Sequence, residues 1–280
     1  MKKAFRTWAW SLGVVARSYW TLLALAALIA LWVFAAYAWL GLPESSVLLL
    51  ILALVWAIAQ LLAAVGIVAG NVVGAEGVAA AEGRKLPLSS LWTCDRRKLL
   101  NALVFCLVSC CLIWSIAAFF DWINNHSIDV ASFLTFHLQK PISHVPIEKI
   151  YGVIETLLWI VLGGFLFSFL HVLLRGGWRE AGKQFWNILA GATFLTPFFT
   201  TLLSVGVFGT LAYQLANWRP HTPVGFWDYS QMILRLGIVL ILLAAGWSFW
   251  SLSLARTLLP AEKGQEGAAE PPAGAVRAES

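Results

Sequence analysis

The chain alternates between long apolar stretches and short polar connections. The clearest stretch runs from Leu99 to Phe120 without a charge, between the segment Asp95-Arg96-Arg97-Lys98 and Asp121. An uncharged apolar run of about 20 residues is long enough, at helical rise, to cross the hydrocarbon core of a bilayer. Comparable stretches recur along the chain. The pattern therefore predicts six membrane-spanning helices, at about residues 20–40, 47–70, 99–120, 150–174, 185–216 and 232–259.

The segments outside these stretches have their own patterns. Apolar side chains recur at three- and four-residue steps between Phe5 and Tyr19, which predicts an amphipathic helix over 4–19 lying in the membrane interface. The alternative is a packed extension of the first span. A short apolar patch at 133–138 predicts a surface or shallow re-entrant helix. We expect residues 1–260 to form one six-span membrane domain and residues 261–280, rich in Glu, Gly, Ala and Pro, to be a disordered cytoplasmic tail.

Composition supports a membrane protein over a soluble one. Hydrophobic residues make up 60% of the 280 residues and charged residues 12%. Soluble domains carry about 25% charged residues, so this chain has too little polar surface to cover a globule of its size. Backbone polar groups in hydrocarbon need internal partners, and the alternating pattern of a barrel is absent from the sequence. The predicted fold class is all-α, a polytopic integral membrane helical bundle.

The distribution of charge predicts an orientation. With six spans, the termini and the connections on their side of the membrane hold 15 of the 19 Lys and Arg residues. Positive charge is enriched on the cytoplasmic side, so we expect a multi-pass protein of a bacterial-type inner (plasma) membrane with both termini cytoplasmic. The net charge of +5 does not point to nucleic acid, because the basic residues form no long run and flank the spans. They are placed to face anionic lipid headgroups.

Two charged residues within predicted spans form the first candidate site. Glu155 lies one to two turns inside the outer end of the fourth span, and Arg235 lies one turn inside that of the sixth. An ionised group in hydrocarbon costs at least about 2.5 kcal/mol unless it is paired or wetted, so the two residues could share an intramembrane ion pair that binds a charged solute or relays protons. The alternatives are a structural clamp and independent snorkelling to the interface.

Other residues predict helix contacts. Gln60, Asn71 and His171 lie in or beside spans, where such groups commonly hydrogen-bond between helices. Pro197 should kink or divide the long fifth span and is a candidate hinge. Closely spaced small residues let helices approach each other. The candidate packing glycines are Gly70, Gly74, Gly163, Gly164, Gly206 and Gly209.

Motifs for catalysis and cofactor binding are missing from the sequence. It has no Gly-rich phosphate loop, metalloprotease motif or nucleophile elbow. His126, His137 and His144 match no compact metal-ligand spacing and are expected to be solvated. A membrane enzyme would need a cytoplasmic pocket joining His171, Glu180 and the 95–98 segment. We therefore expect no catalytic, cofactor-binding or metal site.

The favoured hypothesis is a non-enzymatic accessory, assembly or regulatory subunit of a membrane complex. Its expected partners are the lipid bilayer and other membrane subunits or further copies of itself, with no nucleic acid. Trp159, Trp247 and Trp250 lie within spans, away from the interfacial belts, and indicate contacts with helices or partners. The alternative is a small transporter or lipid-handling protein that uses the fifth helix, broken at Pro197, together with Glu155 and Arg235.

Overall fold

Helices are the only regular elements in the part of the chain that the computed structural model describes, residues 2–42, 46–91, 95–194, 196–218 and 226–258. In chain order they are α1 (Lys2–Arg17), α2 (Tyr19–Leu40), α3 (Val47–Ala80), η1 (Leu88–Leu91), α4 (Arg96–Asn125), α5 (Ser127–Leu138), α6 (His144–Lys183), α7 (Phe185–Phe194), α8 (Thr196–Leu203), η2 (Ser204–Gly209), α9 (Thr210–Asn217) and α10 (Phe226–Leu258).

Six helical stretches of the described residues are long and apolar enough to cross a membrane. They are α2, α3, α4, α6, the continuous stretch Thr196–Asn217 through α8, η2 and α9, and Tyr229–Leu258 of α10. This confirms the predicted class, an all-α polytopic membrane protein. The amphipathic helix expected over 4–19 is α1, which ends at Arg17, so it is separate from the first span. The predicted tail 261–280 lies outside the described residues.

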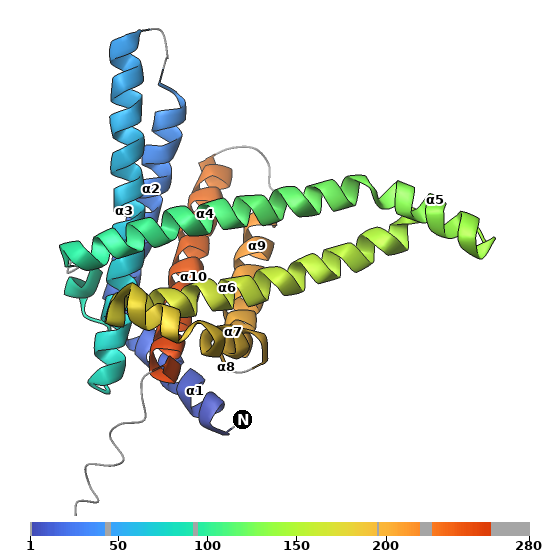
Figure 1. Ribbon diagram of the computed structural model, residues 1–280. Helices are drawn as coiled ribbons and strands as arrows, with labels where there is room; N and C mark the ends of the chain where they lie inside the picture. Colours follow the sequence, from blue (N-terminus) through green and yellow to red (C-terminus); the bar gives the residue numbers. More distant parts are fainter. Residues whose placement is uncertain (1, 43–45, 92–94, 195, 219–225, 259–280) are drawn as a thin grey trace, which may run out of the picture.

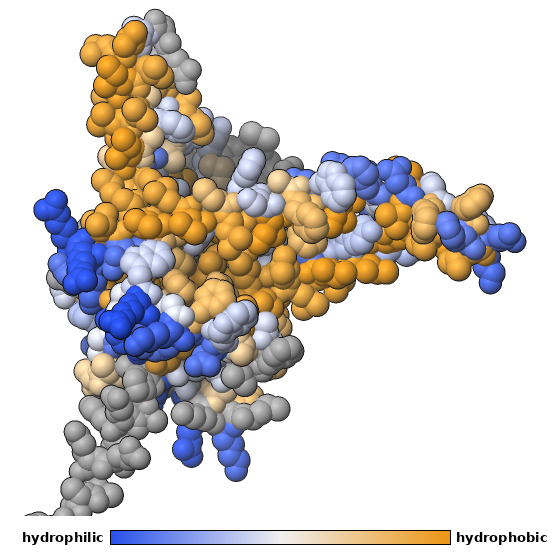
Figure 2. Space-filling view, in the orientation of Figure 1, coloured by the Kyte–Doolittle hydropathy of each residue, from blue (hydrophilic) through white to orange (hydrophobic). Residues whose placement is uncertain are grey.

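The helices are joined at one end of the molecule and diverge at the other (Figure 1). The joined region, which we call the base, contains α1, α7, α8, the start of α4 and the last turns of α3, α6 and α10. Two arms project from it in different directions: the α2–α3 hairpin, and the α4–α6 hairpin with α5 at its tip (Figure 1). Apolar side chains cover the α2–α3 arm and much of the α4–α6 arm, whose outer end carries hydrophilic side chains (Figure 2). α10 is central, since it contacts α1, α2, α3, α6, α8, η2 and α9.

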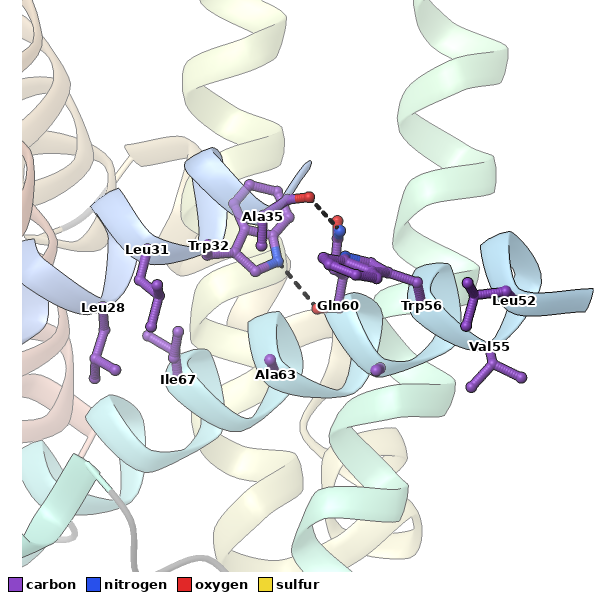
Figure 3. A pocket seen from close by; sticks show the side chains of 11 residues that line it. Leu28, Leu31, Trp32, Ala35, Leu52, Val55, Trp56, Gln60, Ala63 and Ile67 are labelled. Atoms are coloured by element: carbon purple, nitrogen blue, oxygen red, sulfur yellow. Dashed lines mark hydrogen bonds between the residues drawn. The ribbon is translucent and has the colours of Figure 1, made fainter. Parts of the chain in front are cut away.

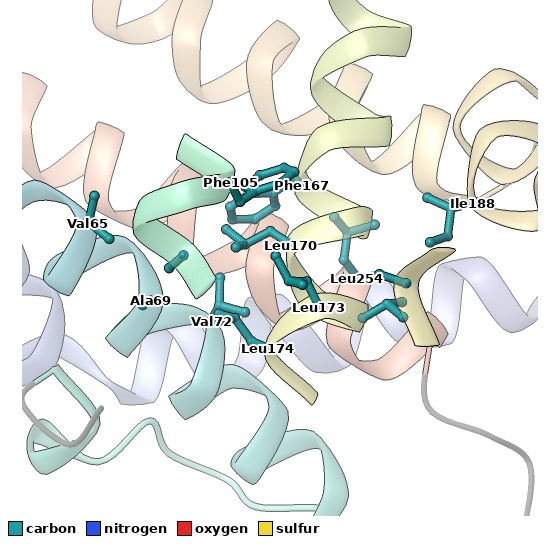
Figure 4. Close-up of a cluster of buried hydrophobic side chains, with 13 residues drawn as sticks. Val65, Ala69, Val72, Phe105, Phe167, Leu170, Leu173, Leu174, Ile188 and Leu254 are labelled. Atoms are coloured by element: carbon teal, nitrogen blue, oxygen red, sulfur yellow. The ribbon is translucent and has the colours of Figure 1, made fainter. Parts of the chain in front are cut away.

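Most of the buried core lies in the base (Figure 4). Residues 170–174 of α6 are all buried, so this part of the helix is surrounded by other elements. An α-helix that is apolar on every side requires such an environment. Around it pack side chains of α3, α4, α7 and α10, among them Val65, Ala69, Val72, Phe105, Ile188 and Leu254. The base is therefore the region where the helices hold one another.

The fifth apolar stretch differs from a single span. The predicted range 185–216 is divided into α7, which packs against α6, and a membrane-length stretch that begins at Thr196. Pro197 is the second residue of α8, where its missing N–H removes no bond from the helix interior. The proline thus marks the start of the spanning stretch and not its middle. That stretch contains a π-helix, η2.

The packing of η2 on α10 depends on one glycine. A Cβ atom at Gly246 would lie 2.7 Å from the Cβ of Phe208, while one at Gly237 on the same helix would meet nothing within 4 Å. The Ser204 hydroxyl donates to the Gly246 carbonyl at 2.8 Å, which holds the two backbones together. Close approach therefore requires the absence of a side chain at position 246.

We expect Gly246→Ala to destabilise the protein by about 1–3 kcal/mol, because Phe208 or the backbone must move. Gly237→Ala is the matched control and should be neutral or stabilising by up to about 1 kcal/mol, since alanine favours the helix. Thermal unfolding of both variants in detergent measures the difference. Equal midpoints for the two would contradict this account of the crossing.

Candidate functional site

A cluster of buried polar side chains joins α3, α6 and α10 in the base. The Nδ1 atom of His171 lies 3.2 Å from Oε1 of Glu76, and its Nε2 atom lies 3.5 Å from the hydroxyl of Ser251. Beside them, the Asn71 amide donates to the Ser248 hydroxyl at 3.3 Å. His171 is 1% exposed and the Glu76 side chain 15%. Each helix therefore contributes polar groups that bond to another helix, although the Asn71 side-chain oxygen is buried without a partner.

Helical spacing brings these residues together. Ser248 and Ser251 are three residues apart and lie on one face of α10. His171 belongs to the fully buried part of α6, and Glu76 lies one turn before the end of α3. A carboxylate only accepts, so its bond with His171 requires the hydrogen to be on Nδ1, and Nε2 then accepts from the Ser251 hydroxyl.

The order carboxylate, imidazole, hydroxyl is that of an acid–base–nucleophile set in acyl transfer. Such a nucleophile must be reached by a substrate and must face donors for the developing oxyanion. Ser251 is 0% exposed, and its hydroxyl is enclosed between α6 and α10. The geometry therefore favours a junction that fixes three helices, and offers a substrate no access to the hydroxyl.

A second set of hydrogen bonds attaches α1 to this junction. The Ser253 hydroxyl donates to Ser11 Oγ at 2.9 Å, and Ser11 in turn donates to the Thr7 carbonyl at 2.9 Å. The indole N–H of Trp8 donates to Thr200 of α8 at 2.9 Å. The amphipathic helix is thereby bonded to both α10 and α8, and is an integral part of the base.

The structure does not bring Glu155 and Arg235 together. Glu155 is half-buried on α6 and accepts from the indole N–H of Trp159, one turn along the same helix, at 3.2 Å. Arg235 donates through Nη1 to the carbonyl of Trp218. Each charged group of the predicted pair thus has a nearer partner.

The candidate packing glycines differ in their surroundings. A Cβ atom at Gly164 would lie 3.0 Å from the Thr201 hydroxyl and one at Gly163 would lie 3.6 Å from Trp250, so both face close neighbours. Gly70 and Gly74 are buried in α3. A Cβ at Gly206 would meet nothing within 4 Å, and one at Gly209 would meet only Val205 of the same π-helix. The close contact in this region is made by Gly246 instead.

The outer histidines bond within their own helices. His126 Nδ1 lies 2.8 Å from the Trp122 carbonyl and His137 Nδ1 lies 3.0 Å from that of Phe133. In the described ranges, no group of three or more His, Cys, Asp or Glu residues could hold a metal ion. Trp247 and Trp250 pack on Phe167 within the base.

An apolar groove of about 460 Å³ lies between α2 and α3 (Figure 3). Trp32 and Trp56 line it together with aliphatic side chains, and it lies in the arm, where most of these residues are exposed. Gln60 closes one wall: its amide donates to the Ala35 carbonyl at 2.8 Å, and its own carbonyl accepts from Trp32 at 3.0 Å. Glu155, Arg235 and Pro197 do not line this groove.

Sequence analysis missed Glu76 as a partner of His171. The residue lies in an Ala-rich segment that continues the second span, where glutamate also favours a helix without any partner. The sequence did contain one indication of this pair: a carboxylate and a histidine both lie at the ends of long apolar runs on the same predicted side of the membrane. Gln60, Asn71 and His171, in contrast, do hydrogen-bond between helices as expected.

No known protein family, curated protein or solved structure matches the chain, so the functional argument depends on its residues and geometry.

We expect Glu76→Ala and His171→Ala each to destabilise the protein by about 1–3 kcal/mol, because each leaves a buried polar group without a partner. Glu76→Gln keeps an acceptor for His171 and should be milder. In the double variant neither member of the pair is left without the other, although Ser251 still loses His171, so its loss should fall short of the sum of the two single losses by about 0.5–3 kcal/mol. Thermal unfolding of the four variants measures this coupling, and strictly additive losses would show that the two side chains are independent.

Proposed function

We propose that the chain is an accessory, assembly or regulatory subunit of a membrane complex, whose arms receive the transmembrane helices of a partner. The observation that carries this proposal is the divergence of the two arms (Figure 1). The most apolar 18-residue window of α3 has 0% of its residues buried, and that of α4 has 17%. Spans in a closed bundle bury one face of each helix against neighbours, whereas these arms leave most faces free.

Lipid tails can cover apolar surface, so exposure alone does not distinguish lipid from protein. The arms also carry groups that suit a protein neighbour better. Glu155 is half-buried on α6 with Trp159 as its hydrogen-bond donor, and a carboxylate at membrane depth is stabilised by further donors. Trp114, in the middle of α4, is 74% exposed, away from the interfacial belt where lipid-facing tryptophan is favoured.

The proposed setting is a bacterial-type inner (plasma) membrane with the base towards the cytoplasm. Hydrophilic side chains gather at the base (Figure 2). The Lys and Arg residues of α1, of the first turn of α4 and of the last turns of α6 all belong to that end, which agrees with the charge asymmetry of the sequence.

A photocrosslinking residue at position 114 tests the partner proposal. Trp186 in α7 is the matched control, because it is also 74% exposed but lies in the base. We expect irradiation in native membranes to give one discrete protein adduct from position 114 and none from position 186. Mass spectrometry should identify the adduct with the chain that copurifies after gentle solubilisation; a second copy of this chain would specify a homo-oligomer. Lipid adducts alone, with a monomer on purification, would contradict the proposal.

A second candidate is lipid handling, favoured by the groove between α2 and α3. Its lining is almost wholly aliphatic and aromatic, which suits an acyl chain and not a charged solute. The groove is a different place from the predicted solute site, since Glu155, Arg235 and Pro197 do not line it.

Filling the groove tests this candidate. We expect Ala63→Trp to weaken binding of a fluorescent long-chain lipid analogue about tenfold, because displacing roughly two methylenes removes about 1.6 kcal/mol. Leu54→Trp is the control, since Leu54 is exposed on the same helix but does not line the groove. Equal affinity for both variants, measured by fluorescence titration, would exclude the groove as the binding site.

A further inference from the structure

The base contains a pocket that differs in kind from the apolar groove. It has a volume of about 280 Å³ and lies where α1, the end of α3 and the end of α10 meet. This volume is close to the lower end of the range of about 300–1,000 Å³ typical of small-molecule sites. Its lining contains Arg17, Arg84 and Arg256, one carboxylate, Glu82, and a wall formed by α1 residues including Trp10.

The three guanidinium groups come from three separate elements. Arg17 belongs to the last turn of α1, Arg256 to the last turn of α10, and Arg84 follows the end of α3. The guanidinium carbon of Arg256 lies 4.5 Å from the centre of the Trp10 ring, so a cation–π contact fixes its position. Arg17 and Arg84, both exposed, line the same space.

The end of α3 is shaped so that Glu82 and Arg84 reach this pocket. The N–H of Gly83 donates to the Val78 carbonyl at 2.8 Å, and that of Glu82 donates to the Ala79 carbonyl at 3.4 Å. These are the two bonds of a Schellman ending, which places Glu82 in the left-handed region at φ 50°. Glycine is usual at that position, whereas here a carboxylate occupies it.

The charges of the pocket do not balance. Within the described part of the chain, the three arginines and Glu82 form no ion pair. Three cations and one anion around a small space leave two positive charges, and like charges repel unless an anion lies between them. Arginine is the side chain best suited to a phosphate, because its planar fork donates two parallel hydrogen bonds.

We infer that this pocket binds a phosphate-bearing anion. Two sources share that chemistry, the headgroup of an anionic lipid and free phosphate. The pocket is formed on one side by the amphipathic α1, which carries exposed Phe5 and Leu12 and so suits a place at the headgroup layer. Basic pockets between membrane helices are able to hold lipid headgroups in this way. The inference is independent of the partner proposed for the arms.

The test uses the full chain in nanodiscs of phosphatidylcholine with a minor fraction of phosphatidylglycerol, and native mass spectrometry to measure the phosphatidylglycerol retained. The pocket variant is Arg17→Gln/Arg84→Gln/Arg256→Gln. The matched control is Arg96→Gln/Arg97→Gln/Arg179→Gln, whose arginines are exposed outside the pocket and whose net charge falls equally, from +5 to +2. A second arm titrates inorganic phosphate into protein in phosphatidylcholine alone, by calorimetry.

We expect the pocket variant to bind its anion at least about tenfold more weakly than the control variant in one of the two arms. The arm that responds identifies the source, lipid headgroup or free phosphate. Equal losses in both triple variants, or no binding in either arm, would overturn the inference. Glu82→Gln removes the opposing charge without removing an arginine, and should tighten binding about fivefold. If the pocket variant does not fold, the Glu82→Gln variant becomes the test. Unchanged anion binding by that variant would then overturn the inference.

Discussion

Polar groups buried in a protein interior need hydrogen-bond partners from the chain itself, and this constraint organises the base of the protein. On α10, Ser248, Ser251 and Ser253 are all buried, and each has a partner on a different helix. The partners belong to α3, α6 and α1. Because α10 must form hydrogen bonds with three neighbouring helices at once, its position among them is fixed. Helix α10 therefore sets the arrangement of the other helices.

The two arms project beyond the region in which these hydrogen bonds join the helices. Beyond the base, α2 and α3 are joined by Gln60, Trp32 and the Trp39 indole, which donates to the Ala53 carbonyl at 2.8 Å, and these bonds stay within the hairpin. α4 and α6 likewise meet mainly through apolar contacts near the base, where Phe105 stacks on Phe169 at 5.6 Å between ring centres. The polar bond between the two hairpins, Glu76 with His171, lies in the base, so among the described residues no such bond holds the outer parts of the arms parallel.

The spans were predictable because length and hydropathy suffice to define them, whereas the pairing of polar residues was not. Glu155 and Arg235 lie at similar predicted depths in the membrane. The sequence predicts the depth of a residue along its helix, but it does not predict which neighbouring helix the side chain faces. Each of them bonds to a nearer group, an indole on its own helix and a backbone carbonyl. Glu76 was missed for the reverse reason, because an interfacial glutamate in an Ala-rich helix is explained without any partner. The separation of α7 from the spanning stretch that begins at Thr196 also depends on the packing of α7 against α6, which no local pattern specifies.

The hydrogen bonds of the base and the proposed anion pocket involve the same helices, α1 and α10. Ser11 and Trp10 belong to the same turn of α1: the first is bonded to Ser253 of α10, and the second lies under Arg256 one turn further along that helix. An anion bound among Arg17, Arg84 and Arg256 contacts α1, α10 and the end of α3 only when all three are assembled. A ligand that binds the assembled state alone stabilises it in proportion to the logarithm of its concentration over its dissociation constant. The bound anion would then attract all three arginines, which repel one another without it, and so hold the base together. Helix α10 would take part in both contacts, through its buried hydroxyls in the polar junction and through Arg256 in the pocket.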